Sequence, residues 1–412
     1  MTRNRICALV AGATTALALL SAGPVAADSI VYEKQSNVWI ANPDGGGQYQ
    51  VTTDGTGTRP YNDPSQADDG TIVAGHGQEI VTLRQNGQVL ARFNPPATTD
   101  SAGQYIDGVP QDLSVSPDGS RVAFSYYQYG CPPGVSCGAR TVLLYSSASA
   151  ATPVAKYGKQ YRRNASWVSN NRILAFGGYQ SQVNVDSPGG GNDDDQHWFD
   201  DEDLNRPPTD LGDGELSRQG DRLVALRNYG ADTHMAFYAV SGNVQGGAVP
   251  GPPAEACFSG KDSSLDSPTW SHNGRAVAFA VSAGIEIMPL PSVTPGNCSG
   301  AGSSRLVIAG GAEPDFGPAA VNPGPRTPAA GGGGTHGVAG KPKAKGCKRL
   351  RGVKRDRCVR KAALAKCSTV RKKSKRKRCA KKAHRAFALK ACARKPKSKR
   401  SRCVRVAKRR YR

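Results

Sequence analysis

The sequence predicts an all-β protein, a six-bladed β-propeller with terminal strand closure, followed by a linker and a small basic helical tail. Three observations carry this prediction. The 412 residues include 49 glycines and 28 prolines, which favours many turns over long helices. One turn-and-strand motif recurs along the chain at a spacing of about 50 residues, a period typical of propeller blades. Lysine and arginine are concentrated at the C-terminal end.

Residues 1–27 have the order of a secretory signal peptide. Arg3 and Arg5 precede the apolar run CALVAGATTALALL, and small residues end at Ala27. That run is too short to span a bilayer comfortably, and Cys7 precedes it, so a lipid-anchored cysteine is not expected. Removal of Cys7 leaves ten cysteines, an even number in a compartment where disulfides persist. The protein is therefore expected to be secreted, either periplasmic or associated with the cell wall.

Charge divides the remaining chain into two parts. Residues 341–412 hold 34 basic side chains and one acid, a net charge of +33, whereas residues 28–340 hold 19 basic and 31 acidic side chains, a net charge of −12. A stretch rich in Pro and Gly lies between them and has the composition of a flexible linker. The predicted domains are the signal peptide 1–27, the propeller 28–322, the linker 323–346 and the polycationic tail 347–412.

The body repeats a polar turn, a glycine, two residues and a short apolar strand. Clear copies are SPDGSRVAF (116–124), SRQGDRLVAL (217–226) and SHNGRAVAF (271–279), with weaker ones at 67–74 and 169–176. The turn positions, separated by 49, 52, 49 and 54 residues, are Gly70, Gly119, Asn171, Gly220 and Gly274. Further apolar stretches such as EIVTL, TVLLY and HMAFYAV alternate in the way of strands. A unit with three or four short strands is one propeller blade.

Six such units can be counted, beginning with the strand at Ile30. The first unit lacks its preceding turn, and the missing piece appears at the other end of the body. There, EPDFGPAAV (313–321) parallels DSPTWSHNG (266–274) and aligns Phe316 with Trp270. We therefore expect the C-terminal segment to complete the first blade, which closes the ring and leaves no sheet edge open.

These repeats resemble the TolB-like, WD40-like repeat family of bacterial exported propellers. The resemblance rests on NVWIANPDGGGQYQVTT, SPDGSRVAF and the Pro-x-Trp-Ser segment at 268–271, and it covers residues 28–322. It implies a periplasmic or extracellular six-bladed propeller that acts mainly as a platform for protein interaction. The α/β domain that precedes the propeller in TolB itself is absent, and the basic tail is foreign to the family. A role in the Tol-Pal system is therefore not implied.

No catalytic residue is predicted. Residues 134–138 match GxSxG, but a nucleophile elbow needs a strand before it and a helix after it, and this segment lies in the loop CPPGVSC. There we expect Cys131 and Cys137 to close a small disulfide ring, and we expect Cys257 and Cys298 to form a structural bridge.

Metal ligands are not predicted either, and no cofactor is expected. His76, His197, His234 and His272 fall in four different blades and have no paired spacing, so turn or surface positions are favoured over convergence on a central channel. Residues 192–203, NDDDQHWFDDED, hold seven carboxylates. Such oxygen ligands suit Ca²⁺, but a disordered acidic loop is the simpler interpretation. Trp39, Trp167, Trp198 and Trp270 are expected to pack within blades, with sugar stacking as an alternative.

The tail contains three copies of one unit. Each copy holds two cysteines, which gives the pairs Cys347 and Cys358, Cys367 and Cys379, and Cys392 and Cys403. CAKKAHRAFALKAC has an apolar helical stripe, but cysteines eleven apart in an unbroken helix would be about 16 Å apart, too far to bond. We expect short helical hairpins stapled by disulfides, with zinc as the alternative.

The tail is expected to bind polyanions through counterion release, with little sequence information. The side chains assigned to this binding are Lys348, Arg349, Lys372, Lys373, Lys375, Arg376, Lys377, Arg378, Lys381, Lys382, Arg400 and Arg402. Because Phe387 and Tyr411 are its only aromatic residues, the tail lacks stacking platforms for single-stranded nucleic acid. Anionic envelope polymers or lipid headgroups are the favoured partners, and nucleic acid is the alternative.

The sequence therefore predicts an exported, non-enzymatic, monomeric propeller that binds a protein or small ligand on one face and is held at the cell envelope by its tail. The first alternative is a lyase or hydrolase that works in the central channel, and the second is a nucleic-acid-binding protein.

Overall fold

The structure is a computed structural model. It describes residues 28–99, 105–130, 138–150, 156–160, 162–177, 182–188, 196–206 and 211–325, together with scattered positions between 378 and 408. The chain divides into two compact units, Met1–Ala329 and Ala330–Arg412, and each is described by itself. The predicted signal peptide and linker lie outside the described residues, apart from 323–325.

The first unit consists of six four-stranded antiparallel sheets, called blades 1 to 6 here. Blade 1 contains, from the inside outwards, β26 (Ala312–Gly317), β1 (Ser29–Lys34), β2 (Asn37–Ala41) and β3 (Tyr49–Gln50). Blade 2 contains β4 (Tyr61–Gln66), β5 (Ile72–His76), β6 (Glu79–Leu83) and β7 (Val89–Phe93). Blade 3 contains β10 (Gln111–Val115), β11 (Arg121–Gly130), β12 (Gly138–Ser147) and β13 (Lys156–Gln160).

The remaining blades follow the same order. Blade 4 contains β14 (Arg162–Ser169), β15 (Arg172–Gly177), β16 (Val183–Asp186) and β17 (Gln196–Phe199). Blade 5 contains β18 (Leu211–Leu216), β19 (Arg222–Arg227), β20 (His234–Ala239) and β21 (Ala254–Phe258). Blade 6 contains β22 (Asp266–Trp270), β23 (Ala276–Val281), β24 (Gly284–Pro289) and β25 (Arg305–Ala309). A small hairpin, β8 (Thr98–Thr99) with β9 (Tyr105–Ile106), lies between blades 2 and 3, and one short 3-10 turn, η2 (Gly230–Asp232), lies in blade 5.

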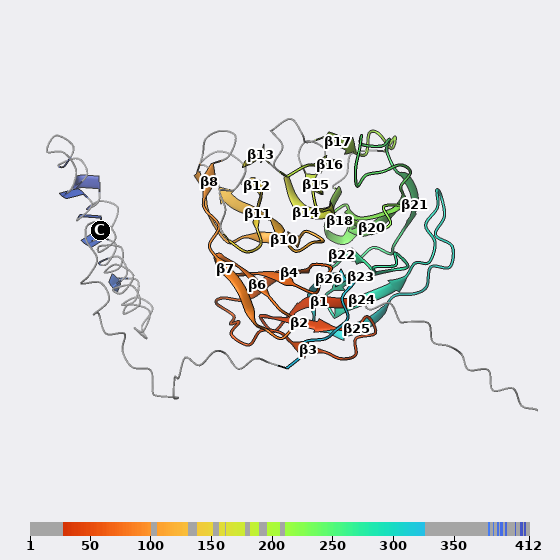
Figure 1. Cartoon of the computed structure of the whole chain (residues 1–412). Coiled ribbons are helices and arrows are strands. Elements are labelled where there is room, and N and C mark those ends of the chain that lie inside the picture. Colours follow the sequence, from red (N-terminus) through yellow and green to blue (C-terminus); the bar gives the residue numbers. More distant parts are fainter. Residues whose placement is uncertain are drawn as a thin grey trace, which may run out of the picture. The chain divides into compact units, whose positions relative to one another are not determined.

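The inner strands form a closed ring. Each contacts the next in the order β26, β4, β10, β14, β18, β22, and β22 contacts β26 again. Figure 1 shows these six strands around the centre of the first unit. The expected six-bladed, all-β architecture is confirmed.

The two ends of the body meet in blade 1. β26 pairs antiparallel with β1, with Ile30 opposite Phe316 and Ser29 opposite Gly317. The Ser29 hydroxyl also donates to the Ala319 carbonyl at 2.7 Å. The predicted terminal closure is therefore correct, and the C-terminal segment supplies the innermost strand of the first blade.

The repeated glycines have one local cause. Gly70, Gly119, Gly220 and Gly274 have φ between 64° and 84°, the left-handed region that glycine enters without steric cost. In each turn the glycine N–H donates to the carbonyl three residues earlier, as Gly119 does to Ser116 at 2.8 Å. The repeat in the sequence is therefore the repeat of a tight turn between the first and second strands of a blade.

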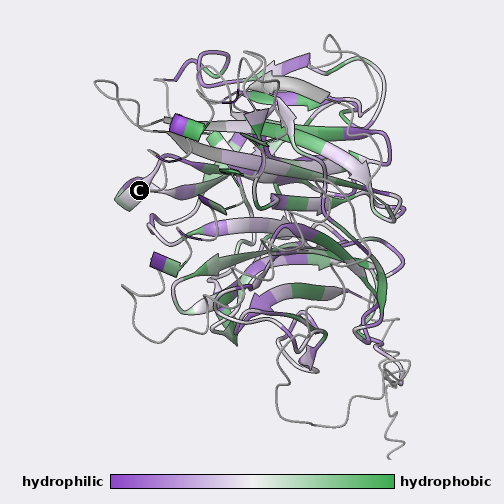
Figure 2. Ribbon diagram, turned by 90° about the vertical axis from the view of Figure 1, so that its left-hand side faces the viewer, coloured by the Kyte–Doolittle hydropathy of each residue, from purple (hydrophilic) through white to green (hydrophobic). Residues whose placement is uncertain are grey.

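The core lies between neighbouring blades. One cluster joins Phe176 and Phe199 of blade 4 to Leu223 and Tyr238 of blade 5, and all four side chains are buried. Figure 2 shows apolar residues along the strands and more hydrophilic residues in the connecting loops. Because each sheet buries its two faces against its neighbours, no blade has a core of its own.

Three of the four tryptophans are buried. The indole N–H of Trp167 donates to the Ser114 carbonyl at 2.8 Å, and that of Trp270 donates to the Glu215 carbonyl at 3.1 Å. Both bonds cross to the preceding blade. Trp198 is also buried, and Trp39 is half-buried. Packing within the ring, not stacking on a sugar, accounts for the three buried side chains.

Cysteines occur in both units. Cys257 of β21 forms a disulfide with Cys298, in the loop after β24. In the second unit the described residues are helical, and Cys379 and Cys392 are disulfide-bonded. Cys131 and Cys137, and the tail cysteines Cys347, Cys358, Cys367 and Cys403, lie outside the described residues. Within the described part of the chain, no helix has the length and apolar character needed to cross a membrane.

Candidate functional site

One backbone feature recurs in every inner strand. A single non-glycine residue in each has a positive φ, and the six are Asp63 (45°), Asp112 (51°), Asn164 (49°), Asp213 (32°), Ser267 (49°) and Glu313 (49°). At each of them the pairing register with the next strand of the blade shifts. Such a β-bulge re-aims a side chain. We call these six residues the inner-strand ring.

The inner strands enclose a cavity of about 540 Å³, within the size range of small-ligand sites. At one end its lining includes Arg59, Gly77 and Val109, which lie near the beginnings of inner strands or in a turn beside them. We call this end the mouth. The lining ends two residues beyond the inner-strand ring, at positions such as Ser65 and Ser114.

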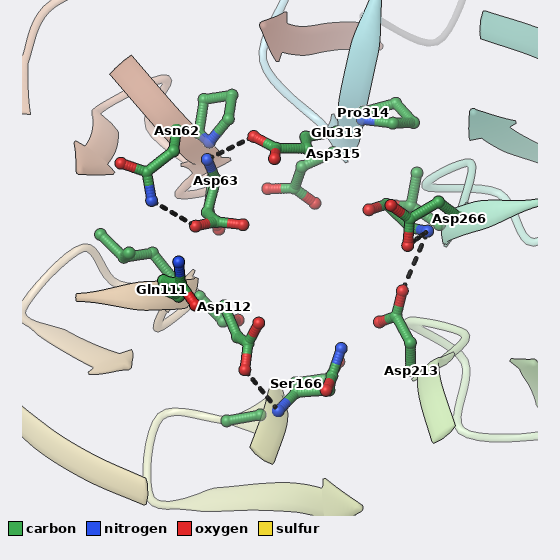
Figure 3. Close-up of a pocket in the computed structure, with 18 of the residues that line it drawn as sticks. Asn62, Asp63, Gln111, Asp112, Ser166, Asp213, Asp266, Glu313, Pro314 and Asp315 are labelled. Atoms are coloured by element: carbon green, nitrogen blue, oxygen red, sulfur yellow. Dashed lines mark hydrogen bonds between the residues drawn. The ribbon is translucent and has the colours of Figure 1, made fainter. Parts of the chain in front are cut away.

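The cavity is strongly acidic. The carboxylate residues that line it are Asp63, Asp112, Asp213, Glu215, Asp266, Glu313 and Asp315. Among the described lining residues, Arg59 is the only one with a basic side chain, and it forms an ion pair with Glu79. Figure 3 shows Asp63, Asp112, Asp213, Asp266 and Glu313 facing the same central space from different strands.

Ring carboxylates also connect neighbouring blades. The backbone N–H of Asp63 donates to Glu313 Oε2 at 2.6 Å, that of Asn164 donates to Asp112 Oδ2 at 3.3 Å, and that of Ser267 donates to Asp213 Oδ2 at 2.9 Å. Each bond runs from one inner strand to the next, and it fixes the side chain that accepts it. The carboxylates are therefore held in place before any ligand arrives.

Burial shifts the protonation of these acids. Burial, together with the charges of neighbouring carboxylates, raises the pKa of Asp213 and of Glu313 to about 7. Burial also raises the pKa of Asp63 well above its usual range, and the charges of Glu313 and Asp112 act in the same direction. The site is thus a set of carboxyl groups in which the ionisation of one disfavours the ionisation of the others. A cationic ligand would offset this repulsion between like charges.

A second acidic group lies deeper in the cavity. Burial raises the pKa of Glu215 to about 8 and that of Asp315 to about 6. The Thr269 hydroxyl is a hydrogen-bond partner of both carboxyl groups, and Asp315 Oδ2 accepts the backbone N–H of Gln66 at 2.6 Å. Glu215 and Asp315 therefore form a distinct pair below the inner-strand ring.

The four histidines considered as channel ligands do not line the cavity. His76 stacks on Tyr61, with ring centroids 4.0 Å apart, and His76 and His234 are buried in the protein. His197 and His272 are exposed. The expectation of turn or surface positions holds for these two and is wrong for His76 and His234. His76 ends β5 and His234 begins β20, the second and third strands of their blades, and neighbouring side chains cover both.

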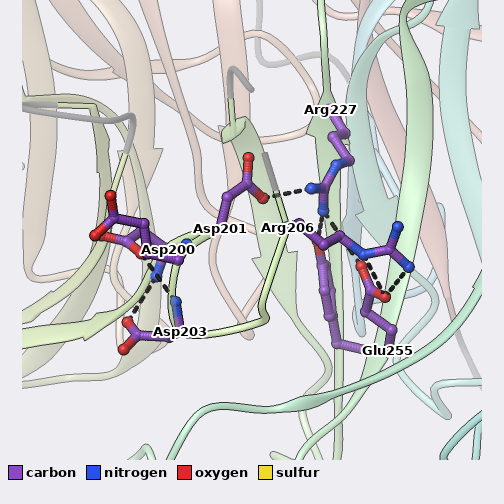
Figure 4. A network of polar contacts seen from close by, with 8 residues as sticks. Asp200, Asp201, Asp203, Arg206, Arg227 and Glu255 are labelled. Carbon is purple, nitrogen blue, oxygen red and sulfur yellow. Dashed lines mark hydrogen bonds and ion pairs between the residues drawn. The ribbon is translucent and has the colours of Figure 1, made fainter. Parts of the chain in front are cut away.

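The structure describes residues 196–203 of the acidic segment 192–203. Ligand atoms of His197, Asp200 and Asp203 lie within 4.8 Å of one another, but His197 already pairs with Asp203 at 2.8 Å. Figure 4 shows that Asp201 turns the other way and pairs with the buried Arg227. Residues 192–195 lie outside the described residues. The carboxylates of Asp200, Asp201 and Asp203 thus form local or interblade contacts.

Arg227 also approaches Glu255 at 3.3 Å, and Glu255 pairs with Arg206 (Figure 4). This network connects the segment after β17 to β19 and β21. It is a structural contact between blades 4 and 5 and lies apart from the cavity lining.

Sequence reasoning missed the inner-strand ring, although the pattern is present. The residue seven positions before each turn position is Asp63, Asp112, Asn164, Asp213 or Ser267. All five are short polar residues, and they recur at the same position relative to the turn in five successive repeats. Aligning the repeats on the turn and comparing this one column would have indicated a ring of polar side chains.

A scan of known protein families and a search of curated proteins find no match to the chain. Solved structures with a similar fold include a functionally unknown protein from Desulfotomaculum acetoxidans, with 10% identity, coverage of 68% of this chain and 99% of that one, and a TM-score of 0.40. A protein assigned as TolB from Agrobacterium tumefaciens has 11% identity and a TM-score of 0.43, and the match covers 69% of this chain and 91% of that one. A prolyl endopeptidase has 11% identity and a TM-score of 0.38, and the match covers 68% of this chain and 48% of that one. Similarity at this level carries no argument about a ligand or a reaction.

Proposed function

We propose that the protein is a binding protein whose propeller accepts a cationic group of its ligand through the mouth of the acidic cavity. The observation that carries this proposal is the inner-strand ring, in which blade after blade directs a polar or carboxylate side chain into one space. Carboxylates in a site of low dielectric attract a cation more strongly than they would in water. Because backbone N–H groups already hold Glu313, Asp112 and Asp213, little ordering is needed when the ligand binds.

The test uses the full chain with pentylamine as the cationic probe and pentanol as its neutral counterpart, in alkaline buffer, by calorimetry. We expect binding of pentylamine and none of pentanol. Glu313→Gln keeps an acceptor for the Asp63 N–H but removes the charge. We expect it to weaken pentylamine binding about tenfold, because a charge-assisted hydrogen bond is worth about 1 to 2 kcal/mol more than a neutral one.

Glu286→Gln is the matched control. Glu286 lies on β24, bonds to Ser304 and does not line the cavity, so this variant should bind pentylamine as the wild type does. Equal binding of the amine and the alcohol would refute the proposal. So would equal losses in the two variants.

We further propose that export and the polycationic tail place this binding protein at the cell envelope. The support is the net charge of +33 in residues 341–412, which favours any polyanion and makes retention depend strongly on salt. A chain that lacks residues 347–412 should appear in the medium, whereas the full chain should stay with the cells until salt releases it. Equal retention of both would exclude the anchoring role, and preference for DNA over heparin at matched salt would favour the nucleic-acid alternative.

An enzyme is the second candidate, and one observation favours it. Asp213, Glu313, Glu215 and Asp315 have pKa values of about 6 to 8, the range that suits general acid-base catalysis at neutral pH. Binding remains the better-supported function because these groups accept hydrogen bonds from the backbone or from Thr269 and are thereby committed to holding blades together. A screen with chromogenic glycosides and lactones, comparing wild type with Asp213→Asn, separates the two: turnover lost in the variant would favour the enzyme.

A further inference from the structure

At the end of the ring opposite the mouth, an ion pair joins the turns of two blades that are distant in the sequence. Asp68 lies in the turn between β4 and β5, and Arg218 lies in the turn between β18 and β19. These are equivalent turns of blades 2 and 5, and Arg218 Nη2 lies 2.6 Å from Asp68 Oδ1. In a ring of six, blades 2 and 5 are opposite each other, with two blades between them on either side. The pair therefore spans the axis of the ring.

Arg218 also acts on the deep pair of carboxylates. Its positive charge lowers the pKa values of Glu215 and Asp315, against the larger effect of burial. Neither Arg218 nor Asp68 lines the cavity, whose deepest lining residues include Glu215 and Asp315. Arg218 thus lies beyond the cavity lining, near the deep pair. Among the described residues that line the cavity, the only basic side chain is that of Arg59 at the mouth, which is paired with Glu79.

We propose that Arg218, held by Asp68 of the opposite blade, is a specificity-determining residue of this cavity. Arg218 supplies the positive charge that faces Glu215 and Asp315. The cavity therefore accepts one cationic group of the ligand, which enters through the mouth and binds at the inner-strand ring. The ligand class is therefore a molecule or chain end with a single terminal ammonium or guanidinium group, rather than a polyamine that extends along the axis. This inference rests on the proposed cationic ligand.

The geometry gives the length of a suitable probe. The inner-strand ring and the deep pair are two residues apart along the strands, which is about 7 Å at the usual rise of a strand. Cadaverine carries an ammonium group at each end of a five-carbon chain, and pentylamine carries one at only one end. The ratio of the two affinities within one variant measures the contribution of the second ammonium group to binding. A general change in the fold or in the electrostatic field of the cavity affects the binding of both probes and cancels in this ratio.

In the wild type, cadaverine should bind better than pentylamine by no more than the statistical advantage of two equivalent ends. In Arg218→Ala the second ammonium can take the place of the guanidinium, and the preference for cadaverine should rise about tenfold, or about 1.4 kcal/mol. Arg275→Ala is the matched control, since it removes an exposed arginine beside the equivalent turn of blade 6. The ratio of cadaverine affinity to pentylamine affinity in Arg275→Ala should equal that of the wild type.

Arg218→Met, which keeps most of the length without the charge, provides a second variant if Arg218→Ala does not fold. A ratio that stays at the wild-type value in the folded Arg218 variant overturns the inference, as does an equal rise in Arg275→Ala. If the wild type binds neither amine, the proposed function itself fails. If the wild type binds both amines, but the ratio of cadaverine affinity to pentylamine affinity is the same in the Arg218 variant as in the wild type, the proposed function stands and the role of Arg218 is refuted.

Discussion

Asp213→Asn should stabilise the folded propeller in alkaline solution and leave its stability unchanged in acid. Asp213 has a pKa of about 7 in the folded protein, against an ordinary value of 3.8, because burial and the charges of Asp266 and Asp112 disfavour its ionised form. Asparagine has the same shape, and its carbonyl oxygen can still accept the Ser267 N–H that Asp213 accepts at 2.9 Å. The substitution therefore removes the cost of ionisation while keeping the bond between blades 5 and 6.

The sign follows from proton binding. A carboxyl group with a higher pKa in the folded state binds more protons when folded, so its contribution is complete below the unfolded pKa. The free energy of unfolding then falls as the pH rises from about 4 to about 7. The difference of about 3 pKa units is worth about 4 kcal/mol at 1.36 kcal/mol per unit, an upper bound because neighbouring carboxyls titrate in the same interval.

Urea unfolding of wild type and Asp213→Asn at a series of pH values between 4 and 9 measures this effect. The two curves should coincide at the acid end and separate by about 2 to 4 kcal/mol above the pKa of about 7. Asp262→Asn, at an exposed turn, is a suitable control because the pKa of Asp262 is lowered, not raised, by hydrogen bonds from Ser264. Parallel curves for wild type and Asp213→Asn over the whole range would refute the reasoning.

Two further predictions concern contacts elsewhere in the ring. Arg227→Met should lower the stability of the protein by about 3 to 5 kcal/mol, because it removes the Arg227 guanidinium from its buried ion pair with Asp201. Thermal unfolding should show this loss, and a double variant with Asp201→Asn should recover part of it. Gly214→Ala should cost about 1 to 3 kcal/mol through overpacking, because a Cβ there would lie 2.4 Å from the Val224 carbonyl oxygen and 2.9 Å from Phe176. Urea unfolding of Gly214→Ala checks this value, with Gly251→Ala, which has open space around it, expected to be nearly neutral.

The fold was predictable because its cause is local. A left-handed glycine at Gly119 or Gly274 shapes a turn within a few residues, and the next strand follows at once, so each blade leaves the same short pattern in the sequence. Closure was predictable for the same reason, since the segment around Phe316 repeats the pattern around Trp270. The cavity was not predictable from the sequence, because the bulges that aim Asp63 and Asp213 inward depend on how each inner strand pairs with the second strand of its blade. The pairing of Arg218 with Asp68 depends on two turns 150 residues apart, which only the closed ring brings together.

The closing strand also sets an order of events during synthesis. β1 is made first among the strands of the ring and β26 last, so the inner edge of blade 1 stays without a partner until residue 317 has been made. An unpaired strand edge invites pairing with other chains, and chains are exposed to such errors while folding is incomplete. A truncation just before Ala312 would make that transient state permanent, and blade 1 would then offer its open edge to any neighbouring molecule.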